Sequence, residues 1–475
     1  LTANISGMPS AGWVAQIKAS SFNAGEAFAV VNNYRNFDFK PYLFHTSDYG
    51  KTWKNLVNEN QVWTYTLSFV QDPVEPNLMF LGSDGGLYVS IDAGKNWTRW
   101  GEGYPNVSTA DLVIHPREHD LVIGTYGRAA YVIDDIRPLR ELAKNGSATL
   151  KKQVVLFDAP DAFITLNQQP SGTRFGADAI YNGENRRRGA MLSYVVNKPE
   201  DKKEVQKEES DKKGKKKKGK ASEPESKPKD DAVNEADKIS YDSLTLEVFN
   251  SNGSLIRTIK RKAPKEDGLQ RMYWRLNEKG RRGPTRRKIK TGAAEPGGVT
   301  VLPGRYKLKL TFGEMSDSTM INVRFDPRVE MSNATLSSKR DMLKRIENGR
   351  GLAGEAMQQL VESKDIANEY LKKMKQKDKE GFKEYIDKAK AVKDSIEQLM
   401  IPFVGADNSK KQGIIRSPEP SISGRFGSAG SYVSSSLQPP GATEIGLVEQ
   451  AEAKLKEAID AVNRLFKHDR SQIRS

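Results

Sequence analysis

The pattern of apolar and polar positions changes twice along the chain and divides it into three parts. Up to about residue 145, short apolar runs alternate with clusters of Gly, Asn, Asp and Ser, which is typical of β-strands joined by tight turns. Short strands of a different arrangement continue to about residue 328. Beyond that point the apolar residues advance by three and four positions, the spacing of amphipathic helices. We therefore expect a multidomain, mainly β protein with domains at 1–145, 146–328 and 329–475.

The first part contains one short pattern twice, S/T-x-D-x-G-x-T/N-W, at 46–53 and 90–97. An Asp carboxylate can accept the backbone N–H groups of a tight turn, a Gly supplies the positive φ, and a Trp anchors the turn in a core. We interpret these residues as structural rather than catalytic. They are Asp48, Gly50 and Trp53 in the first copy, and Asp92, Gly94 and Trp97 in the second.

The two copies are 44 residues apart, which is the length of one blade of a β-propeller. Segments for four strands surround each copy, and a third unit follows over residues 110–133 without the pattern. We therefore predict a partial β-propeller of three four-stranded blades. Because propellers close with about four to eight blades, the missing ones would come from upstream blades of the same or another chain.

The middle part reads as an immunoglobulin-like β-sandwich, with short alternating strands between residues 153 and 325 and a hairpin turn at Asn252-Gly253. Residues 199–238 hold 13 Lys and 12 acidic residues with almost no apolar side chain. A segment of this composition cannot bury enough surface to order itself, so we predict a disordered charged insertion.

The last part predicts an antiparallel helical bundle, because apolar stripes run over 353–374, 382–399 and 448–465. Residues 402–443 are rich in Gly, Ser and Pro, and we predict a long loop there. The G-x-G-x-x-G pattern at 349–354 lacks the preceding strand that a dinucleotide site requires. We interpret it as a break in the helix.

Both copies of the turn pattern, together with 82–90 and 124–136, resemble the closing blades of bacterial sortilin-like proteins with BNR (Asp-box) repeats, a family often labelled glycosyl hydrolase. The resemblance continues through the sandwich and the helices and so covers most of the chain. It implies an exported protein, periplasmic or at the cell surface, that binds a protein, peptide or glycan ligand. The Asp-box itself occurs in proteins of very different activities.

The composition of the chain argues against several classes of function. The chain of 475 residues has no Cys, which excludes disulfides, thiolate metal sites and a Cys nucleophile. Its net charge of +15 gathers at 186–188, at 281–290 and in the helical third, without a recognition helix or zinc-finger spacing. We expect no specific nucleic-acid partner. No run approaches the ~20 apolar residues of a transmembrane segment.

No catalytic set is recognisable, so no catalytic residue, metal or cofactor is predicted. His115 and His119 flank Pro116, which breaks the helix that an i, i+4 metal pair needs. Glycoside hydrolysis needs two carboxylates across the bond. The candidates, none in a diagnostic setting, are Asp72, Glu75, Asp84 and Asp111. Two functions stay open: a non-catalytic recognition module, and a BNR-type glycoside hydrolase whose catalytic residues lie partly on upstream blades.

A ligand-binding site is easier to predict than a catalytic one. Trp13 and Trp63 occupy matching positions ahead of the first strand of successive units, and Tyr126 with Arg128 comes from the third unit. In a propeller this end of the blade commonly faces the central mouth, where aromatic rings and an Arg suit a sugar or peptide. The alternative is that Trp13 and Trp63 pack between blades.

Overall fold

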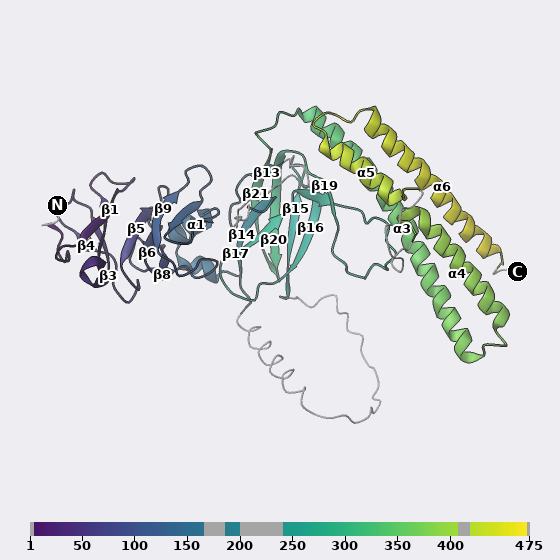
Figure 1. Ribbon diagram of the computed structural model, residues 1–475, viewed down its shortest axis with the longest axis horizontal. Helices are drawn as coiled ribbons and strands as arrows, with labels where there is room; N and C mark the ends of the chain where they lie inside the picture. Colours follow the sequence, from purple (N-terminus) through teal and green to yellow (C-terminus); the bar gives the residue numbers. More distant parts are fainter. Residues whose placement is uncertain (1–3, 166–185, 200–240, 407–418, 473–475) are drawn as a thin grey trace, which may run out of the picture.

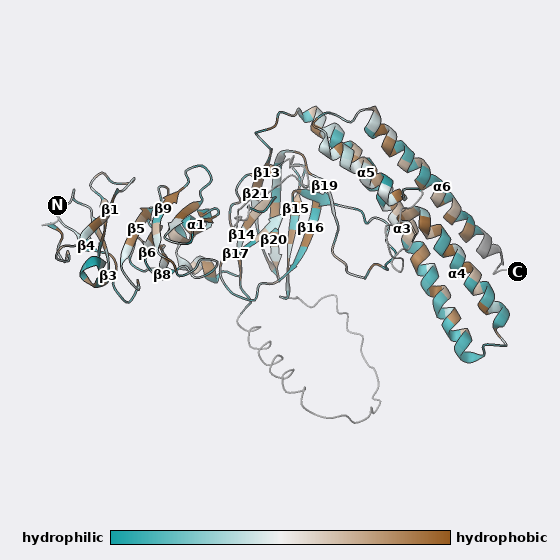
Figure 2. Ribbon diagram, in the orientation of Figure 1, coloured by the Kyte–Doolittle hydropathy of each residue, from teal (hydrophilic) through white to brown (hydrophobic). Residues whose placement is uncertain are grey.

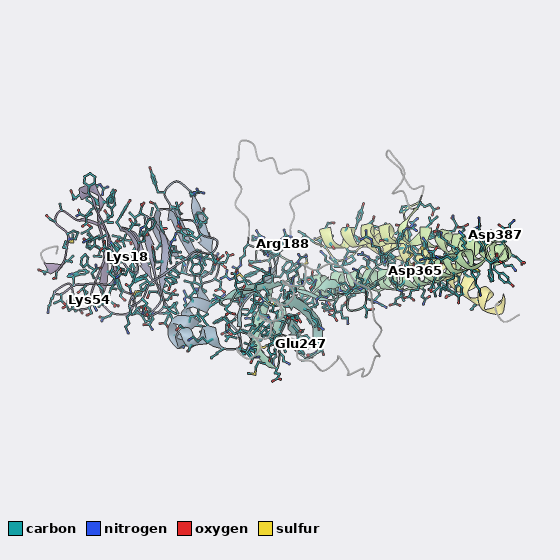
Figure 3. The ribbon with its side chains drawn as sticks, turned by 90° about the horizontal axis from the view of Figure 1, so that it is seen from below. Lys18, Lys54, Arg188, Glu247, Asp365 and Asp387 are labelled. Atoms are coloured by element: carbon teal, nitrogen blue, oxygen red, sulfur yellow. The ribbon has the colours of Figure 1, made fainter. Side chains whose placement is uncertain are left out.

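The computed structural model describes residues 4–165, 186–199, 241–406 and 419–472. The protein is mainly β, with several sheets and a separate helical region (Figure 1). Figure 3 labels Lys18 near one end of the elongated molecule and Asp387 near the other. The charged segment 199–238, predicted to be disordered, lies almost entirely outside the described residues.

The first two sheets are four-stranded antiparallel meanders, as the two copies of the turn pattern predict. The first consists of β1 (Trp13–Ala19), β2 (Ala27–Asn33), β3 (Asp38–Thr46) and β4 (Lys54–Asn55). The second consists of β5 (Thr66–Gln71), β6 (Met79–Ser83), β7 (Gly86–Ser90) and β8 (Thr98–Arg99).

The third sheet has three strands, so the prediction of a fourth is wrong. Its strands are β9 (Thr109–Ile114), β10 (Leu121–Thr125) and β11 (Ala130–Ile133). The chain then enters α1 (Arg137–Asn145), which carries Pro138 in its first turn. Leu139 and Leu142 of this helix pack into the core beside β9 and β10. The apolar residues after β11 are therefore buried as part of a helix, and not as part of a fourth strand.

The three sheets stack on one another in chain order. Phe28 and Leu43 of the first sheet share a core with Phe69 and Leu81 of the second. The opposite face of the second sheet, including Phe80, joins β9, β10 and α1 in another core. Figure 2 shows apolar residues along the strands of these sheets. Burial of each such side chain contributes about 1.5–3 kcal/mol, so the sheets are held mainly by their faces.

Two further sheets form the middle of the molecule around one shared core, which includes Trp274, Leu246 and Leu308. One contains β12 (Val154–Leu156), β14 (Ala190–Val196) and β17 (Gln270–Trp274). The other contains β13 (Ala162–Ile164), β21 (Met315–Phe325), β20 (Gly304–Phe312), β15 (Ser243–Phe249) and β16 (Leu255–Lys262). The predicted hairpin joins β15 to β16, with Gly253 at φ +74°. A small hairpin of β18 (Asn277–Lys279) and β19 (Gly297–Thr300) follows.

The helical region contains α3 (Asn333–Lys377), α4 (Lys383–Val404), α5 (Ile422–Ser435) and α6 (Ala442–Gln472). Helix α5 lies inside the predicted loop 402–443, so that part of the prediction is wrong. Its apolar stripe of Ile422, Phe426, Ala429 and Val433 is fully buried, and Ser421 caps its first turn by accepting the Gly424 N–H at 3.2 Å. Gly and Ser at the intervening positions conceal this helical stripe in the sequence.

The G-x-G-x-x-G segment is continuous helix within α3, so the predicted helix break is wrong. Its glycines permit close packing instead. A Cβ on Gly349 would overlap the Phe426 ring, one on Gly351 the Arg281 side chain, and one on Gly354 the Arg282 carbonyl. The chain around Arg281 and Arg282 therefore lies directly against the backbone of α3.

We predict that Gly354→Ala lowers the thermal midpoint of the helical region, corresponding to about 1–3 kcal/mol, because the added methyl meets backbone that cannot move aside. Gly427→Ala on α5 is the matched control, since no atom lies within 4 Å of its added Cβ. That control should gain up to about 1 kcal/mol from helix propensity. Circular dichroism at 222 nm measures both; stabilisation by Gly354→Ala would contradict the packing role.

Candidate functional site

The first copy of the turn pattern is a closed set of hydrogen bonds. Asp48 Oδ1 accepts the Thr52 N–H at 2.9 Å, and its Oδ2 accepts the Thr52 hydroxyl at 2.6 Å. The Thr46 hydroxyl donates to Asp48 Oδ1 at 2.8 Å. Gly50 lies at φ +79°, and the buried Trp53 donates from Nε1 to the Gly50 carbonyl at 3.2 Å. The Asp48 carboxylate is therefore occupied by its own turn.

The second copy repeats this arrangement with one difference. Asp92 accepts the Asn96 N–H at 2.9 Å and its side-chain amide at 2.7 Å, and Gly94 again lies at φ +79°. The buried Trp97 donates from Nε1 to the Leu56 carbonyl, 3.3 Å away in the segment after β4. This indole therefore ties the second sheet to the first.

Hydrogen bonds from Thr52 hold the pKa of Asp48 at about 2. Partial burial acts to raise the pKa of Asp92, but hydrogen bonds from Asn96 and Ser90 outweigh it and lower the value. Both carboxylates stay ionised over the ordinary pH range. Each carboxylate accepts hydrogen bonds from its own turn and has a lowered pKa, so neither is suited to exchange protons with a substrate near neutral pH.

A second group of contacts runs along one edge of the three sheets, and we call it the aromatic edge: Trp13, Tyr34, Arg35, Tyr65, Asp84 and Ser108. The Arg35 guanidinium lies 5.5 Å from the Trp13 ring centroid and 4.7 Å from that of Tyr34. Tyr34 stacks on Tyr65 with centroids 4.6 Å apart and planes at 25°. These contacts join the first sheet to the segment that precedes β5.

The aromatic edge continues to the third sheet through polar contacts. The Asp84 N–H donates to the Tyr65 carbonyl at 3.1 Å, and the Asp84 carboxylate accepts the hydroxyl of Ser108. Burial and the neighbouring Asp84 raise the pKa of Tyr65 to about 12, so this hydroxyl stays protonated. Finally, the Tyr126 N–H donates to the Ser108 carbonyl at 3.0 Å. A single line of contacts thus leads from Trp13 to the backbone of Tyr126.

Sheet topology explains why these residues meet. Trp13 is the first residue of β1, and Ser108 immediately precedes β9. Tyr34, Asp84 and Tyr126 each follow directly after the second strand of their sheet. In an antiparallel meander, the first strand begins on the same side of the sheet on which the second strand ends. Stacking the sheets in order then places the three edges in one row.

The predicted binding residues are open to solvent. Trp13 is 62% exposed, Trp63 is 68% exposed and Tyr126 is 83% exposed, so none of the three fills the core between sheets. One side of the Trp63 ring lies against Gly85, where an added Cβ would be 2.7 Å from Cε3. Arg128 is exposed as well, and among the described residues its side chain has no ion-pair partner.

Sequence reasoning missed Tyr34, Arg35 and Tyr65, and it named Asp84 only as a possible catalytic carboxylate. Their position in the repeat could have identified two of them, because Tyr34 and Asp84 each follow the second strand of their unit. Aligning the repeats at that position, and not only at the turn pattern, would have found them.

Asp72 is not free for chemistry, because it is fully buried in an ion pair. Arg140 of α1 donates from Nε to its two oxygens at 3.0 and 2.9 Å. The Arg140 Nη1 also lies 3.1 Å from His119 Nδ1. Burial, aided by the Arg140 charge, lowers the pKa of His119 and keeps the imidazole neutral. This cluster fixes α1 to the second sheet.

The other histidine of the predicted turn is a structural acceptor: His115 Nδ1 accepts the Glu118 N–H at 3.1 Å. Across the described ranges, no group of three or more His, Asp or Glu side chains is arranged to hold a metal ion. Within the same ranges, no helix has both the length and the hydropathy needed to cross a bilayer.

Comparison with known proteins gives little further guidance. No family model matches the sequence, and no curated protein matches it. Among solved structures, the chain is similar to the GH74 enzyme of Niastella koreensis, with 15% identity and a TM-score of 0.23 over 39% of this chain. The match spans 28% of the length of that enzyme.

We predict that Asp72→Ala lowers the free energy of unfolding of the sheets by about 3–5 kcal/mol, because it leaves the Arg140 charge buried without its partner. Arg117→Ala, which removes an exposed pair with Glu118, is the control and should change stability by less than about 1 kcal/mol. Urea unfolding followed by Trp fluorescence measures both. Equal effects of the two substitutions would contradict the anchoring role.

We predict that the turns weaken in acid. The pKa of Asp48 is about 2 in the folded chain against an ordinary value of 3.8, so its contribution is present above about pH 4 and is lost as the pH falls towards 2. The thermal midpoint of wild type should therefore fall over this interval. The Asp48→Asn/Asp92→Asn variant should start lower at pH 7 and fall less. Parallel curves for the two proteins would contradict the assignment.

Proposed function

We propose that this chain is a non-catalytic recognition module that binds a glycan or peptide along the aromatic edge. The observation that carries the proposal is the pair of exposed indoles, Trp13 and Trp63, each with one side supported by the protein. A ring held in this way keeps an open apolar surface at little entropic cost, and such surfaces suit sugar rings and extended peptides. Tyr126 and Arg128 extend the same edge on the third sheet.

We further propose that the three sheets are blades of a β-propeller of the sortilin-like, Asp-box type, in an exported protein of the periplasm or cell surface. The proposed domains are 1–145 for the blades, 146–328 for an immunoglobulin-like sandwich and 329–475 for a helical bundle. The order of sheet stacking supports the first of these assignments.

The outer face of the third sheet supports the expectation of further blades. Val122 pairs with Val113 on one side and with Val132 on the other, and all three side chains are exposed. An apolar row across three strands is typical of a face that another sheet covers. Blades from an upstream segment of the same or another chain would fit this position.

Glycoside hydrolysis is the less favoured function, because its candidate carboxylates are engaged locally. Asp72 is paired with Arg140, and the Asp84 carboxylate accepts the Ser108 hydroxyl. Glu75 Oε1 accepts the Asn77 N–H at 3.1 Å, and Asp111 Oδ1 accepts the Leu112 N–H at 2.9 Å. These contacts leave none of the four carboxyls free to act as a general acid.

We predict that Trp13→Ala and Trp63→Ala each weaken binding to a ligand selected from glycan and peptide arrays by about five- to tenfold, since each removes about 1 kcal/mol of stacking. Tyr385→Ala is the matched control: this ring is also exposed but lies on α4. Isothermal titration calorimetry measures affinity. Equal affinity in all variants, or release of reducing sugar from any polysaccharide in the panel, would overturn the proposal.

A further inference from the structure

A cavity of about 750 Å³ lies in the helical region, away from the aromatic edge. Its walls come from α3, from α5 and from the segment between β18 and the end of β19. Figure 1 shows α3 and α5 side by side next to β19. The volume falls within the range of about 300–1,000 Å³ that small-molecule sites occupy.

Phe426 of α5 lines this cavity but is fully buried against α3, and the remaining α5 wall carries little side-chain bulk. Gly427 has no atom within 4 Å of an added Cβ, and Gly430 has only Ile346 Cγ2 at 3.9 Å. Glycine inside a helix is unfavourable relative to alanine. The glycines of α3 are explained by close packing, whereas packing does not explain these two. Their effect is to keep the space open.

Positive charge predominates around the cavity, which is lined by Arg281, Arg282 and Arg350. Arg281 pairs with Glu355 at 2.6 Å, and Arg282 donates to the Ala293 carbonyl at 3.1 Å. Arg350 differs from them: within the described residues its guanidinium has neither an ion-pair nor a hydrogen-bond partner, and it lies beside Gly283. One guanidinium of the three is therefore available to a ligand.

The wall contains one carboxylate, which is already engaged. Glu347 Oε1 accepts the Arg281 N–H at 3.3 Å, and burial raises the pKa of this carboxyl. The rest of the wall is mixed: Leu343, Ile289 and Val299 are apolar, whereas Thr285, Thr300, Ser431 and Ser434 are polar. The cavity thus combines a cationic side with an apolar patch that includes Leu343.

We propose that this cavity binds an organic anion: its acidic group, a carboxylate or phosphate, meets Arg350, and its apolar part lies against Leu343 and the glycine face of α5. The guanidinium offers two parallel N–H donors, which match the oxygens of such a group. The absence of side chains at Gly427 and Gly430 leaves room for the apolar part.

The test uses the full chain and two fluorescent probes of similar shape. The first, 8-anilinonaphthalene-1-sulfonate, is an apolar anion; the second, N-phenyl-1-naphthylamine, lacks the acidic group. Arg350→Met should weaken binding of the anionic probe at least tenfold and leave the neutral probe unchanged. Arg464→Met, which removes an exposed Arg of α6, is the matched control and should change neither.

A second variant fills the cavity. Gly427→Leu/Gly430→Leu should abolish saturable binding of both probes, whereas Gly446→Leu on α6, where an added Cβ also has no neighbour within 4 Å, should not. Displacement of the anionic probe by decanoate or by phenyl phosphate supports the proposal and identifies the acidic group. Absence of saturable binding, displacement by neither compound, or an Arg350→Met effect equal for both probes would overturn it. The Arg350→Met result stands even if the filled variant does not fold.

Discussion

The burial of both faces of the second sheet is the constraint on which the β part of the structure depends. One face, with Phe69 and Leu81, packs on the first sheet, and the other, with Phe80, packs on the third sheet and α1. Trp97 reinforces this order, because its indole N–H reaches across to the Leu56 carbonyl. Since the sheets are fixed face to face, their edges fall into one row. The aromatic edge is a consequence of that stacking, because its residues come from the strand ends of all three sheets and not from a separate helix or loop.

Local signals made part of the fold predictable from the sequence. The turn pattern positions Asp48 and Asp92, and the strands on either side of each copy form the two four-stranded sheets. The predictions of secondary structure failed where tertiary packing determines whether a segment forms a helix. Residues after β11 form helix α1 because its apolar side is buried, and α5 escaped notice because Gly and Ser surround its four buried apolar residues.

The site was predictable only in part for a similar reason. Trp13, Trp63 and Tyr126 were named from the sequence, and all three are exposed. The prediction that Trp13 and Trp63 occupy matching positions is wrong, because Trp13 begins β1 whereas Trp63 lies three residues before β5. The stacking of Tyr34 on Tyr65 and the bond between Asp84 and Ser108 join different repeats, so no single repeat contains the pair. The roles of the glycines also depend on tertiary structure. Both Gly354 and Gly427 lie within helices, but Gly354 permits a close contact with Arg282, whereas Gly427 borders a cavity.

The central claim is that the indoles of the turns are buried, while Trp13 of the aromatic edge and Trp63, which lies against Gly85 beside it, are open. Hydroxyl-radical footprinting, read by mass spectrometry on the folded chain, tests it directly and needs no ligand. The account predicts rapid oxidation of Trp13 and Trp63 and slow oxidation of Trp53 and Trp97. Equal oxidation rates for all four would contradict it, because either the turn indoles would then be exposed or Trp13 and Trp63 would be covered.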